Sequence, residues 1–127
     1  MKDYASMSDE QIAVMVAGLC TIEGVSINED GMAVRNVIDD SPGSYSGGDY
    51  IEFEFDPCNN PADAWPIISE NKISTMWMTS EKEWCAWAEG DLEEGAWCWE
   101  NVPDFYHCGE SQLRAAMIVF LMMKEGE

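Results

Sequence analysis

Apolar residues recur at helical spacing near the start of the chain. They lie three or four positions apart, so that an α-helix would place them on one face, and they are Ile12, Met15, Val16 and Leu19. Ser8, followed by Gln11 three positions later, forms the pattern of a capping box. The spacing therefore predicts a helix from about residue 9 to residue 20.

Two further stretches predict strands. The segment from Met32 to Ile38 is rich in β-branched residues, and the segment from Asp39 to Gly48 has the composition of a loop. From Tyr50 to Phe55, apolar and acidic residues alternate. The apolar ones are Ile51, Phe53 and Phe55, and the acidic ones are Glu52 and Glu54. This alternation is typical of a strand that is half buried in a sheet.

The segment from Asp56 to Ile68 predicts a rigid corner, because it contains three prolines, two asparagines and a tryptophan. A helix is expected to begin near Ala64 with Asp63 as its cap, and a start at Pro61 after an Asn60 cap is the alternative. We interpret the corner as structural and expect Trp65 to anchor it over the core. Its motif residues are Pro57, Asn59, Asn60, Pro61, Asp63, Trp65 and Pro66.

The second half of the chain predicts three strands and a helix. The strands are Ile73 to Thr79, Glu83 to Glu89 and Ala96 to Val102, and the last two would form a hairpin. The cap Glu110-Ser111-Gln112 precedes a helix with one apolar stripe, which comprises Leu113, Met117, Phe120 and Leu121, widened by Ala116, Val119 and Met123. We therefore expect a single α+β domain over residues 1–127. Its antiparallel β-sheet of about five strands would pack with N- and C-terminal helices and a short central helix.

The charge of the chain restricts its partners. Six Lys and Arg residues stand against 25 Asp and Glu residues, which gives a formal net charge of -19. Such a surface repels nucleic acids and anionic lipids, so we expect a basic protein as partner and no direct binding of nucleic acid or membrane. Because 46% of the residues are hydrophobic, the chain can bury enough apolar surface to fold.

The cysteines favour a reducing compartment. Five of them occur without the spacing of a disulfide scaffold, so we expect free thiols. A zinc site would lack any C-x-x-C knuckle, since its possible ligands are Cys85, Cys98, His107 and Cys108. His107 is the only candidate base for a catalytic set. We therefore expect no metal, no cofactor and no catalytic residues. The chain also begins without the apolar run of a signal peptide, and the apolar stretch from Leu113 to Met123 is too short to span a bilayer.

Two groups of residues are candidate binding surfaces. Glu52, Glu54 and Asp56 would lie about 7 Å apart along one strand face, either as a solvated face or as a row of charges for a basic groove. The second group is a tryptophan cluster that could form a protein-binding patch or part of the core, and its members are Trp84, Trp87, Trp97 and Trp99.

Two sequence blocks, Phe55 to Ile73 and Leu113 to Met123, resemble the NinX family of small tailed-phage and prophage proteins. The resemblance implies a phage accessory gene product in the cytoplasm of an infected bacterium, and it carries over no catalytic residues. We expect an interaction protein that imitates polyanion charge to bind a basic host protein, such as a nucleic-acid-binding defence component. A small-ligand binder with a tryptophan-lined pocket is the alternative, and an enzyme is the third possibility. The oligomeric state is not indicated.

Overall fold

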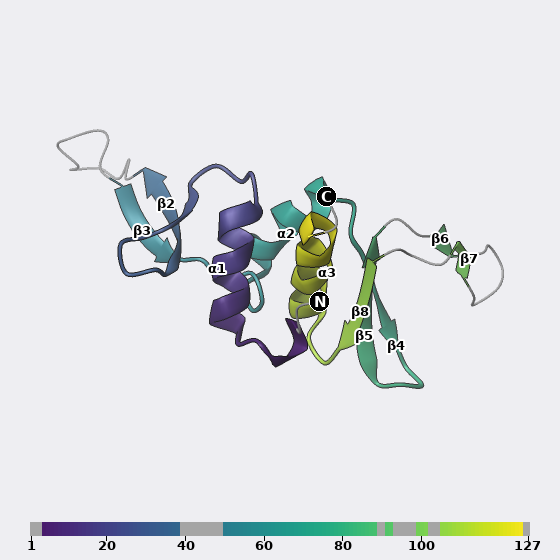
Figure 1. The fold of residues 1–127 in the computed structure, drawn as a ribbon. Coiled ribbons are helices and arrows are strands. Elements are labelled where there is room, and N and C mark those ends of the chain that lie inside the picture. Colours follow the sequence, from purple (N-terminus) through teal and green to yellow (C-terminus); the bar gives the residue numbers. More distant parts are fainter. Residues whose placement is uncertain (1–3, 39–49, 89–90, 93–98, 102–104, 126–127) are drawn as a thin grey trace.

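Three helices lie between two antiparallel sheets in the computed structural model of the protein (Figure 1). The structure describes residues 4–38, 50–88, 91–92, 99–101 and 105–125. In chain order the elements are η1 (Tyr4–Ser6), α1 (Asp9–Leu19), β1 (Val25–Ile27), β2 (Ala33–Ile38), β3 (Tyr50–Glu54), α2 (Pro61–Glu70), β4 (Ser74–Met78), β5 (Glu83–Ala88), β6 (Asp91–Leu92), β7 (Trp99–Asn101), β8 (Phe105–Gly109) and α3 (Gln112–Glu125).

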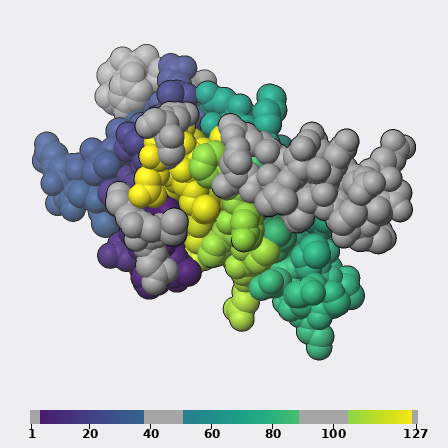
Figure 2. All heavy atoms as spheres, turned by 45° about the vertical axis from the view of Figure 1, so that its right-hand side comes forward, coloured from purple at the N-terminus to yellow at the C-terminus, as the bar shows by residue number. Residues whose placement is uncertain are grey.

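The described strands form two three-stranded sheets and one separate pair. The first has the order β1-β2-β3 and the second the order β4-β5-β8, while β6 and β7 pair with each other. The predicted α+β class is confirmed, but the prediction of one sheet of about five strands is wrong in its arrangement. In Figure 2, β1 and β2 protrude at one end and the segment of β4 and β5 at the other, with α3 between them.

The predicted hairpin between 83–89 and 96–102 is wrong. β5 pairs with β4 and β8, so that Cys85 lies opposite Cys108, while β7 pairs with β6 instead. β6 and β7 are therefore not part of the second sheet, whose third strand is β8. Strand propensity identifies strands without identifying their partners, because pairing is decided by packing of the whole domain.

The C-terminal helix is the centre of the core. Residues Ala115 to Leu121 of α3 are all buried, and the helix packs against α1, α2 and all three strands of the second sheet. Its cap is as predicted, because the Ser111 hydroxyl accepts a hydrogen bond from the Arg114 backbone at 3.2 Å. The predicted first helix and its capping box are also confirmed.

The corner helix begins earlier than the expected start near Ala64. α2 starts at Pro61, and the Asn60 side chain accepts a hydrogen bond from the Ala62 backbone at 3.0 Å, so the alternative start is the correct one. The buried residues of α2 are Asp63, Ala64, Ile67 and Ile68. The expectation that Trp65 anchors the corner is wrong, since its side chain is 60% exposed.

The third strand is not half buried as predicted. Ile51 and Phe53 are 42% and 44% exposed, and among the apolar residues of this stretch only Phe55, just beyond β3, is buried at 2%. The helix that covers the first sheet, α1, packs against β1 and β2 and leaves β3 at the edge. The predicted loop over 39–48 lies outside the described residues.

Candidate functional site

The acidic residues singled out in the sequence lie where β3, the corner and α1 meet. Glu52 and Glu54 are exposed on β3, and their cross-strand neighbours on β2 are Asn36 and Val34. Asp56 follows the end of the strand and is half buried. The predicted row of three charges on one strand face therefore contains only Glu52 and Glu54.

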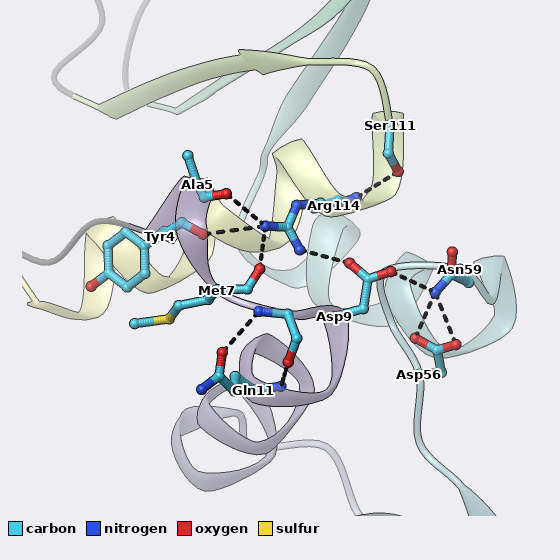
Figure 3. Close-up of polar contacts among 10 residues, drawn as sticks. Tyr4, Ala5, Met7, Asp9, Gln11, Asp56, Asn59, Ser111 and Arg114 are labelled. Atoms are coloured by element: carbon cyan, nitrogen blue, oxygen red, sulfur yellow. Dashed lines mark hydrogen bonds and ion pairs between the residues drawn. The ribbon is translucent and has the colours of Figure 1, made fainter.

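Asp56 is held by a polar network that joins the corner to α1. The Asn59 side-chain amide donates to both carboxylate oxygens of Asp56 and to Asp9 Oδ2, each at 3.1 Å (Figure 3). These hydrogen bonds fix the carboxylates of Asp9 and Asp56 relative to one another. Asn59 was predicted as a turn residue, and its role in connecting two acids was not visible in the sequence.

Arg114 of α3 completes this network. Its Nη1 lies 2.6 Å from Asp9 Oδ1, and its Nη2 donates to the carbonyls of Tyr4, Ala5 and Met7 at 3.3, 3.2 and 2.6 Å (Figure 3). The hydrogen bond from Asn59 and the Arg114 guanidinium both lower the pKa of Asp9. Asp9 therefore stays ionised as part of the scaffold and is not a free charge for a ligand.

A second ion pair secures the corner against the first sheet. Arg35 Nε of β2 lies 3.3 Å from Asp63 Oδ1, and the Asp63 side chain is fully buried. The other oxygen, Asp63 Oδ2, accepts a hydrogen bond from the Asp56 backbone at 2.9 Å. Asp63 was predicted as a helix cap, and nothing in the local sequence indicated that Arg35 would be its partner.

A cleft of about 260 Å³ opens beside this network. Carboxylates of four residues line it, namely Asp9, Glu10, Glu54 and Asp56. Its apolar wall includes Val14 and Met32, and both residues also line an adjoining apolar groove of about 430 Å³. A third cleft of about 430 Å³ on the first sheet is lined by Glu29, Asp30 and Glu52, among other residues.

The buried thiol near the cleft is chemically inert. Cys58 is 2% exposed, and burial, followed by the charge of Asp9, raises its pKa to about 12. It is protonated at neutral pH, and a protonated thiol is a poor nucleophile. At the opposite end of the network, burial and the hydrogen bond to Glu125 raise the pKa of Tyr4 to about 12.

The tryptophans do not gather as one described patch. Trp87 is 8% exposed, and Trp84 makes an edge contact with Trp77 at 5.6 Å between ring centroids. Trp97 lies outside the described residues, and of Trp99 only the backbone in β7 is described. None of the three clefts described above is lined by a tryptophan.

Two cysteines and the histidine lie on the second sheet, Cys85 in β5 and His107 and Cys108 in β8. Cys108 Sγ lies 3.0 Å from Cys85 Sγ, and burial lowers the pKa of His107. The four cysteines in the described part of the chain are free, and Cys98 lies outside it. Within that part no cluster of three or more His, Cys, Asp or Glu side chains is arranged to hold a metal ion.

Comparisons with known proteins give one family match. A family model described as "Bacteriophage P22, NinX" matches residues 3–124, which is nearly the whole chain. A search of curated proteins found no match. Among the described residues, the helices are too short or too polar to cross a bilayer.

Proposed function

The chain belongs to the NinX family of bacteriophage P22, and from this premise we propose that it is a phage accessory protein that binds a basic protein of the infected bacterium. Nucleic-acid-binding proteins, including those of host defence, present cationic surfaces and form the class of partner that fits this charge. The site of action is the host cytoplasm. The binding surface is the acidic face formed by β3, the corner and the loop from β1 to β2.

One observation carries the proposal: the exposed charged side chains in residues 4–38 and 50–71 are negative. In residues 4–38 and 50–71, Arg35 is the only Lys or Arg, and its guanidinium is paired with Asp63. The exposed acids of the same residues are Glu10, Glu23, Glu29, Asp30, Glu52, Glu54 and Glu70. Their summed field attracts a cationic partner from a distance and repels polyanions.

The geometry of β3 supports the same surface. Glu52 and Glu54 point to one side of the strand, and their cross-strand neighbours Asn36 and Val34 carry no charge. Neither glutamate has an ion-pair partner among the described residues. Both carboxylates are therefore available to lysine or arginine side chains of a partner.

The other two functions receive less support. A tryptophan-lined ligand pocket would need exposed rings around a cavity, whereas Trp87 is buried and the clefts described above contain no tryptophan. A cysteine-dependent enzyme would need an activated thiol, whereas burial raises the pKa of the Cys58 and Cys85 thiols to about 12. We therefore propose a binding role without catalysis.

Capture from host lysate tests the proposal. The protein is immobilised and exposed to lysate of the infected bacterium at low salt, and retained proteins are identified after elution with salt. The test variant is Glu52→Gln with Glu54→Gln. Its matched control is Glu81→Gln with Glu110→Gln, which removes the same charge from exposed positions near the second sheet.

The expected result has three parts. Retained proteins are basic, they are released as salt screens the field over a Debye length of about 8 Å, and the test variant loses them while the control variant keeps them. Equal capture by both variants would show that binding does not use Glu52 and Glu54. Retention of acidic or neutral proteins that salt does not release would contradict a charge-driven function.

A further inference from the structure

Among the described strands, β3 lies at the edge of its sheet. β3 pairs with β2 on one side, and no other described strand pairs with it on the other (Figure 1). An edge strand presents unpaired N–H and C=O groups, which are a template for another strand. Which residues carry these groups follows from the hydrogen-bonding pattern of the sheet.

The unpaired backbone groups belong to the two glutamates. The Phe55 N–H donates to the Ala33 carbonyl at 3.1 Å, so this opposite pair is hydrogen bonded. Along an antiparallel ladder, hydrogen-bonded pairs alternate with pairs that are not hydrogen bonded. Phe53 and Ile51 are therefore the next residues of β3 whose backbones bond to β2. The N–H and C=O groups of Glu52 and Glu54 therefore point away from β2.

The opposite side of the ladder agrees with this assignment. The N–H of Asn36, the partner of Glu52, donates to the Gly24 carbonyl at 2.8 Å. Asn36 thus directs its backbone toward β1 and away from β3. The edge of β3 that faces away from β2 is consequently defined residue by residue.

The side chains of the strand alternate between charge and apolar surface. Ile51 and Phe53 are 42% and 44% exposed on one face, where the neighbouring Val37 is 39% exposed, while Glu52 and Glu54 lie on the other face. Charges on an edge strand protect against unwanted pairing. Protection alone does not explain why two large apolar side chains of the same strand also face solvent.

We propose that β3 binds an extended strand of a basic partner in which Lys or Arg residues alternate with apolar residues. The added strand would place its cations opposite Glu52 and Glu54 and its apolar side chains beside Ile51 and Phe53. This inference rests on the proposed function, and it specifies how the basic partner is held. Main-chain hydrogen bonds to Glu52 and Glu54 provide affinity, and the alternation provides register.

A second copy of the chain does not fit this edge. Antiparallel pairing of two β3 strands would place the carboxylates of Glu52 and Glu54 directly across from carboxylates of the other copy. The Cβ atoms of directly opposite residues are about 5 Å apart, and like charges at such positions destabilise a strand pair. A strand with cations at these positions converts the same contacts into attraction.

A peptide pair tests the proposal on the full chain. The probe is a ten-residue peptide that alternates lysine and valine, and its control carries N-methyl groups on every second amide, those that would face β3. Both peptides have the same charge and side chains. We expect the plain peptide to bind at least tenfold more tightly in calorimetric titration at low salt.

Amide hydrogen exchange measured by NMR locates the contact. On binding, protection should rise at the amides of Glu52 and Glu54, whereas those of Ile51 and Phe53 are already bonded to β2 and should change less. Equal binding of both peptides, or binding without added protection at Glu52 and Glu54, would overturn strand addition and leave charge-driven binding intact.

Absence of binding by either peptide at low salt would also overturn strand addition. The proposed function is judged separately by the salt-sensitive capture of basic host proteins. The two failures are therefore distinguishable. As a further control, the Glu81→Gln and Glu110→Gln variant should bind the plain peptide as the parent does, whereas the Glu52→Gln and Glu54→Gln variant should bind it at least tenfold more weakly.

Discussion

The two three-stranded sheets share strand number and antiparallel pairing but differ in how they are covered. In the second sheet, β5 is central and its residues Cys85 to Ala88 are all buried, because α3 packs across β4, β5 and β8. In the first sheet, α1 packs against β1 and β2, and β3 remains exposed on both faces. The second sheet is part of the core, whereas the first presents a strand to solvent.

The difference originates in the helices. α3 is buried along seven consecutive residues between the second sheet and the other two helices, while α1 buries only Ile12, Ala13, Val16 and Ala17. A helix with one apolar face can cover part of a sheet, whereas a helix that is apolar on most sides joins two layers. Binding is therefore expected on the first sheet and stability on the second.

The largest expected difference between the two sheets comes from replacing one aromatic residue by alanine in each sheet. Trp87→Ala should lower the free energy of unfolding by about 3–5 kcal/mol, because the ring is 8% exposed. Phe53→Ala should cost about 1 kcal/mol, because the ring is 44% exposed and gains mainly from Arg35, 5.6 Å from its centroid. Urea unfolding measures both values. Similar losses for the two variants would contradict the assignment of β3 to the surface.

Oxidation should form a disulfide within the second sheet and so stabilise the protein against unfolding. Excess oxidised glutathione, which accepts two electrons and two protons to give two thiols, should link Cys85 to Cys108, since their sulfurs lie 3.0 Å apart. Closing this loop should raise the free energy of unfolding by about 2–4 kcal/mol. Peptide mapping checks the bond and urea unfolding checks the gain. Cys108→Ala serves as the control, and stable glutathione adducts on both cysteines of the parent would refute the prediction.

Arg114 connects the helix of the second sheet to the helix of the first. Arg114→Met keeps much of the side-chain volume but removes the bonds to Asp9 and to the carbonyls of Tyr4, Ala5 and Met7. The expected loss is about 2–3 kcal/mol, since hydrogen bonds to charged groups contribute more than neutral ones. Urea unfolding measures it. A loss as small as that of Phe53→Ala would show that the two halves hold together without this arginine.

The same junction predicts a dependence on pH. The hydrogen bond from Asn59 and the Arg114 guanidinium hold the pKa of Asp9 below its unfolded value, so its ionised form stabilises the fold. This contribution is complete above the unfolded pKa, near 4, and is lost as pH falls through the folded value. The parent should therefore exceed Asp9→Asn in stability at pH 7, and the difference should shrink at pH 3. A constant difference in urea midpoints across this range would contradict the prediction.

Features that depend on neighbouring residues were predictable from the sequence. The Ser8 capping box, the Ser111 cap and the apolar stripe of α3 are all present, because caps and helical spacing act within a few positions. The alternation in β3 also predicted correctly that Glu52 and Glu54 face solvent. It could not show that Ile51 and Phe53 do so as well, since that depends on how far α1 extends over the sheet.

The remaining features depend on distant partners. The pairing of β5 with β8 and the contact of Arg114 with Asp9, which is 105 positions away, have no local signal in the sequence. The same holds for Arg35 and Asp63. The site therefore divides in two: its exposed glutamates were predictable, and the network that fixes Asp56 was not.

The smallest expected effect concerns the corner between the two sheets. Trp65→Ala should change the free energy of unfolding by less than about 1 kcal/mol, because the ring is 60% exposed. Ile67→Ala in the same helix is the matched control and should cost about 2–5 kcal/mol, because its side chain is fully buried. This contrast follows from their positions in α2, because residues two positions apart lie on nearly opposite sides of a helix, and Ile67 faces the core. If urea unfolding gave Trp65→Ala the larger loss, Trp65 and not Ile67 would face the core.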